Sequence, residues 1–230
     1  MVELKKLSGD YKHFFFLLLY ALLYMWFFYL EKTIVPKHYM FSPFDLKIPF
    51  VKEFVVPYLL WYIYMASGFI YLGIVSKKDY YRMFWFIFIG VFVCYSVYAI
   101  FPNGQNLRPT ITGSDVFSRI VRGIYAIDTP TNVAPSMHVL NSIAIHIGLT
   151  GYEPFKKRPG LRLTSFILMV TISASTVFIK QHSVLDGLWA IALSIALYII
   201  IYLVPGLIEK GRRMEKGKKK TVMSMENAIK

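Results

Sequence analysis

The sequence predicts an all-α integral membrane protein, a bundle of six transmembrane helices with short interfacial helices. Hydrophobic residues make up 56% of the 230 residues and charged residues only 17%, whereas a soluble domain has about 25% charged residues. The apolar residues also gather in runs close to the ~20 residues that a helix needs to cross a membrane. The six candidate spans are residues 13–30, 54–75, 84–101, 135–150, 163–179 and 184–204.

The fourth candidate span is the least apolar of the six. Its polar residues include Ser136, His138, Asn141, Ser142 and His146. We still predict a membrane helix there, because polar side chains within membrane helices face a bundle interior or a water-filled cavity. No internal repeat or linker divides the chain, so all 230 residues are predicted to form a single domain.

Most of the 26 lysines and arginines flank the predicted spans on the side that holds both termini, with the densest run at 210–220. The positive-inside rule therefore places both termini in the cytoplasm, with a basic tail from about residue 206, and the opposite rim outside. A net charge of +13 in this arrangement indicates contact with anionic lipids. We expect the membrane as a partner, and no nucleic acid.

The long outer loop, residues 102–134, contains a predicted short helix. Ser114 is a candidate N-cap, and apolar residues follow it at helical spacing. This helix either lies in the membrane interface or packs over the end of the bundle. A proline-interrupted stretch at 42–53 is expected at the same interface, and Asn103-Gly104 predicts a turn.

Three polar motifs fall on the predicted outer rim, where polar residues are costly and therefore candidates for function. The first is Arg108-Pro109, in the loop after the third span. An arginine can hold a phosphate through two parallel hydrogen bonds. An ordinary loop arginine that touches lipid head groups is the alternative.

The second motif is Pro135-Ser136-Met137-His138. Proline favours the first position of a helix, so the amides of Ser136, Met137 and His138 are expected to point out of a helix N-terminus and to bind an anion. Ser136 adds a hydroxyl donor, and His138 can protonate a leaving oxygen. The alternative is a helix cap with a histidine whose hydrogen bonds are satisfied locally.

The third motif contains His182 and Asp186. Residues four apart share one helix face, and an aspartate that accepts one imidazole N–H leaves the other ring nitrogen free as a nucleophile or base. A local ion pair that caps the sixth span is the alternative. Cys94 is the sole cysteine and the motifs contain no carboxylate cluster, so we expect no bound metal and no cofactor.

Together the three motifs resemble those of the type 2 phosphatidic acid phosphatase superfamily, whose pattern is KxxxxxxRP, PSGH and SRxxxxxHxxxD. In this chain they read Arg108-Pro109, Pro135-Ser136-Met137-His138 and Ser175-(x)6-His182-(x)3-Asp186. The order of the motifs, the six-span frame and the shared side agree with that family. The resemblance covers the chain from the first motif to the third.

The resemblance implies metal-independent phosphoryl transfer on a lipid. By the motif match, His182 attacks phosphorus and becomes a phosphohistidine, Asp186 orients it, and His138 protonates the departing alkoxide. The groups that hold the phosphate oxygens are Arg108, Ser136 and the amides at the helix start, that of Met137 included.

The chain departs from the family pattern at three positions. The family lysine falls on Phe101, the glycine of the second motif on Met137, and the arginine of the third motif on Thr176. Lys180, two residues before His182, is a candidate substitute that binds phosphate.

These variants are closest to the branch of the superfamily that contains inositol phosphorylceramide synthase. Asp128 and Asn132, which precede the second motif, are also similar to that branch. The resemblance makes them candidates for contacts to a lipid head group.

The favoured function is a lipid phosphatase that hydrolyses a phosphate or pyrophosphate ester of a phospholipid, isoprenoid or sphingoid lipid. The first alternative is a phospholipid head-group transferase with a lipid alcohol as acceptor. By the motif match Arg108 and Lys180 supply two cations where the family has three, which favours a diester or pyrophosphate substrate. The second alternative is a channel or transporter with a His–Asp proton relay, although such a site lies near the membrane midplane and these motifs lie at one rim.

Overall fold

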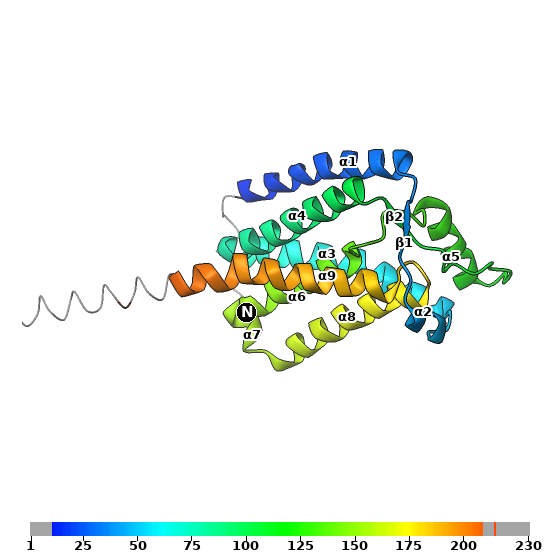
Figure 1. Ribbon diagram of the computed structural model, residues 1–230. Helices are drawn as coiled ribbons and strands as arrows, with labels where there is room; N and C mark the ends of the chain where they lie inside the picture. The colour runs from blue at the N-terminus through cyan, green and yellow to red at the C-terminus, as the bar shows by residue number, and fades with distance from the viewer. Residues whose placement is uncertain (1–10, 209–213, 215–230) are drawn as a thin grey trace, which may run out of the picture.

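The computed structural model describes residues 11–208 and 214, which form a helical bundle with almost no sheet (Figure 1). The all-α prediction is confirmed. The basic tail expected from about residue 206 lies, from residue 209 onward and apart from Met214, outside the described residues. The first elements are η2 (Lys12–Leu18), α1 (Leu19–Thr33), β1 (His38–Tyr39), α2 (Pro43–Lys47), η3 (Lys52–Phe54), α3 (Val55–Val75), α4 (Lys77–Ile100) and β2 (Asn103–Gly104). The later ones are α5 (Val116–Ile127), α6 (Met137–Gly151), α7 (Glu153–Lys156), α8 (Pro159–Phe178), α9 (Val184–Tyr198) and η4 (Ile199–Leu203).

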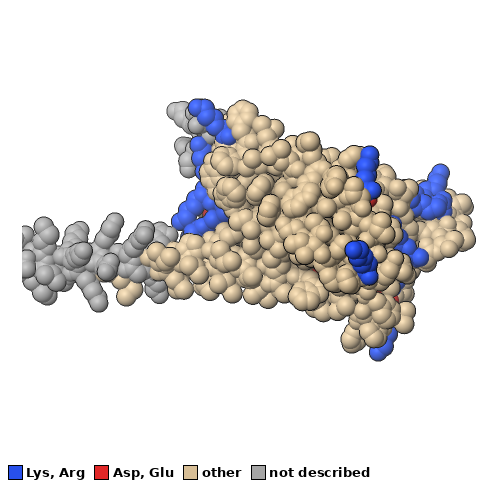
Figure 2. All heavy atoms as spheres, turned by 45° about the horizontal axis from the view of Figure 1, so that its top comes forward, with Lys and Arg blue, Asp and Glu red and all other residues tan. Residues whose placement is uncertain are grey.

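Five helices within the described residues are long and apolar enough to cross a membrane. They are Lys12–Thr33, Lys52–Val75, Lys77–Ile100, Pro159–Phe178 and Val184–Ile208. In the view of Figure 2, the lysines and arginines gather toward the two ends of the molecule and leave a band between them without charged side chains. These features indicate a membrane protein, because a band of this kind matches the hydrocarbon layer.

The fourth predicted span, which corresponds to α6, is not confirmed as a membrane helix. α6 has 15 residues, and at ~1.5 Å per residue it is about 22 Å long, shorter than the ~30 Å hydrocarbon core. α6 is instead the central helix, since α3, α4, α8 and α9 all pack against it. Its polar Asn141 and Ser142 are buried among these neighbours, which explains why the segment has fewer apolar residues than the helices around it.

α6 packs closely against α4 because one residue at their contact is small. A Cβ atom on Gly148 would lie 2.9 Å from both Cβ and Cγ of Met83, whose side chain is fully buried. Small residues of this kind let membrane helices approach one another. The close approach holds the central helix, and therefore its N-terminus, in place.

We expect Gly148→Ala to lower the free energy of unfolding by about 1–3 kcal/mol, the usual cost of an overpacked core. The matched control is Gly123→Ala on the exposed face of α5, where nothing lies within 4 Å of the new Cβ. That control should raise stability slightly, since alanine favours a helix by about 1 kcal/mol over glycine. Melting temperatures in detergent measure both, and shifts of equal sign and size would contradict the packing argument.

The short elements β1, β2, α2 and α5 gather at one end of the bundle, where α6 and α9 begin (Figure 1). β1 and β2 form a two-stranded parallel sheet in which His38 pairs with Asn103, so the loop after α1 is tied to the loop after α4. The turn predicted at Asn103-Gly104 is therefore a strand. Local propensity favoured the turn, whereas pairing with a segment 65 residues earlier in the chain made the strand.

α5 packs over this end of the bundle, as one of the two expected placements has it. Its Val121 is fully buried and packs with Val55, Tyr58 and Ile179. The predicted cap was wrong by one residue: the N-cap is Asp115, whose carboxylate accepts the Ser118 N–H at 3.1 Å.

Candidate functional site

The three sequence motifs meet at the end of the bundle where the short elements gather. A small cavity of about 30 Å³ lies there, room for about one water molecule. Its lining includes Arg108 from the loop before α5, Met137 and His138 from the start of α6, and His182 from the residues just before α9. Asp128, Asn132 and Gln181 also line it.

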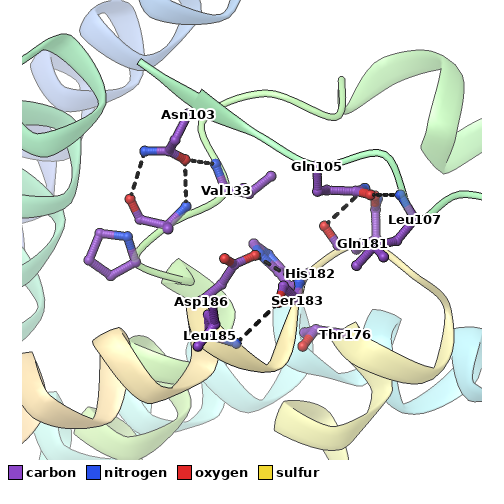
Figure 3. A network of polar contacts seen from close by, with 12 residues as sticks. Asn103, Gln105, Leu107, Val133, Thr176, Gln181, His182, Ser183, Leu185 and Asp186 are labelled. Carbon is purple, nitrogen blue, oxygen red and sulfur yellow. Dashed lines mark hydrogen bonds and ion pairs between the residues drawn. The ribbon is translucent and has the colours of Figure 1, made fainter. Parts of the chain in front are cut away.

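The start of α9 and the His182 ring are held by the same carboxylate. Asp186 is fully buried, and its Oδ2 accepts the Ser183 N–H at 2.9 Å and lies 3.2 Å from His182 Nδ1. Ser183 and Asp186 form a capping box, the local pattern that starts a helix. With a proton on Nδ1 directed to Asp186, the Nε2 lone pair of His182 is available for reaction. Figure 3 shows the two side chains pointing toward each other.

His138 faces His182 across the cavity, with 5.9 Å between their ring centroids. α3 holds the His138 ring, because Tyr58 stacks on it at 4.5 Å and Trp61 lies at 4.7 Å. Its Nε2 is buried and has no hydrogen-bond partner within the described part of the chain. Two imidazoles from different helices thus share one small space, one of them backed by a carboxylate.

The α6 N-terminus is two residues later than predicted. Pro135 precedes the helix, Ser136 is the N-cap, and Met137 is the first helical residue. The Ser136 N–H donates to the Asp186 carbonyl at 3.0 Å, which joins the starts of α6 and α9. Its hydroxyl oxygen is buried without a partner among the described residues. The first amides of a helix have no intrahelical acceptor, and because Met137 and His138 line the cavity, these amides lie beside it.

Asn103 organises the loop that leads into α6, a role the sequence analysis missed. Its side chain is fully buried, and Oδ1 accepts the N–H groups of Val133 at 2.9 Å and Ala134 at 2.8 Å, as Figure 3 shows. Its Nδ2 donates to the Ala134 carbonyl at 3.0 Å. A lone asparagine in a loop carries no sequence signal for such a contact, because its partners lie 30 residues away.

Arg108 is held against the cavity by two neighbours. Its guanidinium donates to Gln181 Oε1 and to the Tyr125 carbonyl at 3.3 Å, and it lies 4.5 Å over the Tyr125 ring. Nε is buried and has no partner within the described residues. Burial lowers the pKa of Arg108, and the charge of Asp128 acts in the opposite direction. An arginine pKa is so high that the side chain stays charged, so it brings a cation with an unused donor to the cavity.

Asp128 and Asn132 also border the cavity. Asp128 Oδ2 accepts from Tyr58 Oη and Gln181 Nε2, each at 3.2 Å. Burial raises the pKa of the Asp128 carboxyl. Asn132 Nδ2 donates to Glu31 at 2.9 Å, and its Oδ1 has no partner in the described chain.

Lys180 does not reach the cavity, although the sequence analysis proposed it as a phosphate ligand. Its Nζ donates to the carbonyls of Asp45 at 2.7 Å and Ile48 at 2.6 Å. The last carbonyls of a helix have no intrahelical donor, so the C-terminal end of α2 takes up the ammonium group. Gln181, the next residue, lines the cavity instead.

Asp45 of α2 supports the residues that follow His182, a second role that the sequence analysis missed. Its carboxylate is 2% exposed and accepts Ser183 Oγ at 2.6 Å and the Val184 N–H at 2.8 Å. It also accepts the Ser42 N–H at 2.7 Å in a capping box. The sequence analysis placed residues 42–53 at the interface without a helix, and nothing in the sequence signals the contact of Asp45 with the start of α9.

Phe101 and Thr176, where the chain departs from the family pattern, do not line the cavity. Phe101 stacks on His38 with 4.0 Å between ring centroids. Thr176 is buried, and its carbonyl accepts the N–H groups of Gln181 at 2.8 Å and His182 at 3.0 Å. Its backbone thus shapes the turn that presents His182, while no charged group stands at position 176. Within the described residues, Arg108 is the one lysine or arginine in the cavity lining.

Fold and site together define a helical bundle of membrane-protein character with a histidine-lined polar cavity at one end. Comparison with known proteins finds no match, whether the chain is compared with family models, curated proteins or solved structures.

Proposed function

We propose that this chain is a membrane enzyme that hydrolyses a lipid phosphate or pyrophosphate ester through a phosphohistidine on His182, without a metal. One observation carries the proposal: two imidazoles face each other at 5.9 Å, and one of them is backed by a buried carboxylate at 3.2 Å. A nucleophile oriented by a third group and faced by an acid–base group is the arrangement that covalent catalysis requires. The motif resemblance supports the same assignment.

The proposed reaction has two steps. His182 Nε2 attacks phosphorus, the bond to the lipid oxygen breaks, and His138 gives that oxygen a proton. His138 then takes a proton from water, whose oxygen attacks phosphorus, and phosphate leaves His182. Arg108, the Ser136 hydroxyl and the first α6 amides stabilise the charge on the other phosphate oxygens, which is the main task in phosphoryl transfer.

We further propose that α6 also crosses the membrane, as a short span in addition to the five long helices. Neighbouring helices surround it, so it does not have to present an apolar face to lipid. Both termini then lie on one side, which the positive-inside rule makes cytoplasmic, and the His182 cavity faces the opposite side. Cysteine-accessibility labelling at the two ends tests this arrangement.

A head-group transferase is the second candidate, and the composition of the cavity favours it. Arg108 is the sole cation of the lining, while Asp128 contributes a carboxylate and Asn132 an amide oxygen. Such a site suits a diester of charge −1 better than a monoester that approaches −2. Carboxylate and amide oxygens accept hydrogen bonds from hydroxyl groups, so Asp128 and Asn132 are proposed to bind the head group.

An acceptor assay separates the two candidates. Purified protein in detergent receives a labelled phosphatidic acid, polyprenyl pyrophosphate, sphingoid phosphate or phosphodiester lipid, first in water alone and then with ceramide or diacylglycerol. We expect steady release of phosphate from a monoester or pyrophosphate without added alcohol. Product that forms only when the lipid alcohol is present supports the transferase and overturns the hydrolase. The His182→Ala variant is the blank for both arms.

A further inference from the structure

A second and much larger cavity lies farther along the bundle from His182. Its volume is about 610 Å³, and it shares no lining residue with the His182 cavity. α6 forms its floor through Ile143 and Ile147, and α9 forms one wall through Ile191 and Ile195. These last two side chains are 43% and 57% exposed, so the wall ends at the outer surface of the bundle. We refer to this cavity as the α6–α9 groove.

The far end of the α6–α9 groove is polar, and its basic side chains, Lys156 and Arg82, stand there together with the carboxylates of Glu153 and Asp79. Lys156 of α7 lines it, and the Arg82 guanidinium lies 5.8 Å over the ring of Tyr202, which also lines it. Tyr202 Oη is buried without a hydrogen-bond partner in the described chain. Lys156 pairs with Glu153 at 3.1 Å, but both side chains are more than half exposed, and such surface pairs are weak enough to exchange for another anion.

We propose that the α6–α9 groove binds one anionic phospholipid from the leaflet opposite the His182 cavity. An acyl chain lies along the isoleucines, and the phosphate sits at the Lys156 and Arg82 end, where Tyr202 Oη donates to it. Charge complementarity and an unused buried hydroxyl at the polar end of an apolar groove select this ligand. A lateral groove of this size in a membrane helix bundle is filled by lipid, and its basic end sets which lipid.

The bound lipid stabilises the packing of α9, which follows His182, on α6, which carries His138. The inference is independent of the proposed chemistry, because the two cavities are separate. The His182→Ala protein is therefore expected to bind the lipid as the wild type does. This comparison distinguishes failure of the lipid site from failure of the proposed enzyme.

The test uses photoreactive phosphatidylglycerol and phosphatidylcholine, each with a diazirine in the acyl chain, in nanodiscs that contain the full chain. Labelled peptides from α6 and α9 are quantified by mass spectrometry. We expect phosphatidylglycerol to label groove peptides more strongly, and Lys156→Gln or Arg82→Gln each to reduce that preference about fivefold. Lys157→Gln, at an exposed neighbour outside the groove lining, is the charge-matched control and should change nothing.

A second variant tests occupancy without relying on charge. Ile191→Trp adds bulk within the groove at a position that is 43% exposed, whereas Leu188→Trp places the same ring on α9 outside the groove lining. We expect Ile191→Trp to reduce groove labelling and Leu188→Trp to preserve it. Equal labelling by the two lipids in the wild type, or labelling that survives Ile191→Trp, overturns the proposal.

Discussion

Replacing His182 by alanine is expected to abolish phosphoryl transfer, with a loss on the order of 10⁵-fold, as for other nucleophiles in covalent catalysis. The expectation follows from the free Nε2 that the Asp186 contact leaves on the ring. Asp186→Asn should cost about 10⁴-fold, because an amide does not hold the required tautomer. Circular dichroism and melting temperature must show that each variant is folded, since Asp186 also caps α9.

His138→Ala is the informative partner of the His182 variant. Loss of the general acid should cost about 10²–10⁴-fold on a lipid ester. A p-nitrophenyl phosphate substrate needs no proton on its leaving group, so His138→Ala should still form an acid-labile phosphoryl adduct from it, whereas His182→Ala should form none. His38→Ala is the matched control, because His38 is exposed, lies at the same end of the bundle and does not line the cavity.

Chelation separates this mechanism from a metal-dependent one. No three His, Cys, Asp or Glu side chains of the described residues are grouped as metal ligands. Activity is therefore expected to survive EDTA. Loss of activity on chelation, with recovery on adding magnesium, would contradict the proposed mechanism.

Substitutions of Arg108 and Lys180 are expected to have different effects, although both side chains are basic and both were predicted to bind phosphate. Arg108→Gln removes the sole cation of the cavity lining and should lower kcat/KM by about 10²–10³-fold, the usual cost of losing one stabilising group in a transition state. It should also weaken competitive inhibition by inorganic phosphate. The melting temperature should change little, since Arg108 is only partly buried.

Lys180→Met should instead act on stability. Its ammonium bonds to two carbonyls at the end of α2, and its loss leaves these buried acceptors unpaired at a cost of about 1–3 kcal/mol. The melting temperature should fall, while the inhibition constant of phosphate stays near the wild-type value. A phosphate inhibition constant that weakens as much in Lys180→Met as in Arg108→Gln would place the ammonium in the site after all.

Helix positions were largely predictable because their signals are local. Length and apolar content located five long helices. The i, i+4 spacing predicted the contact of His182 with Asp186, which is 3.2 Å in the structure, although His182 precedes α9 and does not share a helix face with Asp186. The start of α4 was predicted seven residues too late, at position 84 instead of Lys77. Its charged first turn hid the start, although Ser76 caps the helix with the Asp79 N–H as donor at 3.3 Å.

The supporting residues of the site were not predictable from the sequence. Asp45 contacts Ser183 across 138 positions, and Gln181 contacts Arg108 across 73. No periodicity or fixed spacing in the sequence indicates either contact, because the two residues of each pair meet only when the chain has folded. Lys180 illustrates the same limit: its type and position suited a phosphate ligand, and the position of α2 decided where its side chain points.

The sequence by itself therefore determined the helical, membrane-type character of the chain and the three groups of side chains that could take part in chemistry. It could do so because the length of apolar runs, helix caps and i, i+4 spacing are patterns within short stretches of the chain. Only the tertiary structure decided that α6 is the buried centre of the bundle, that His138 faces His182, and that Arg108 stands beside them without Lys180. Those outcomes depend on how helices pack, and packing is set by contacts between residues far apart in the chain.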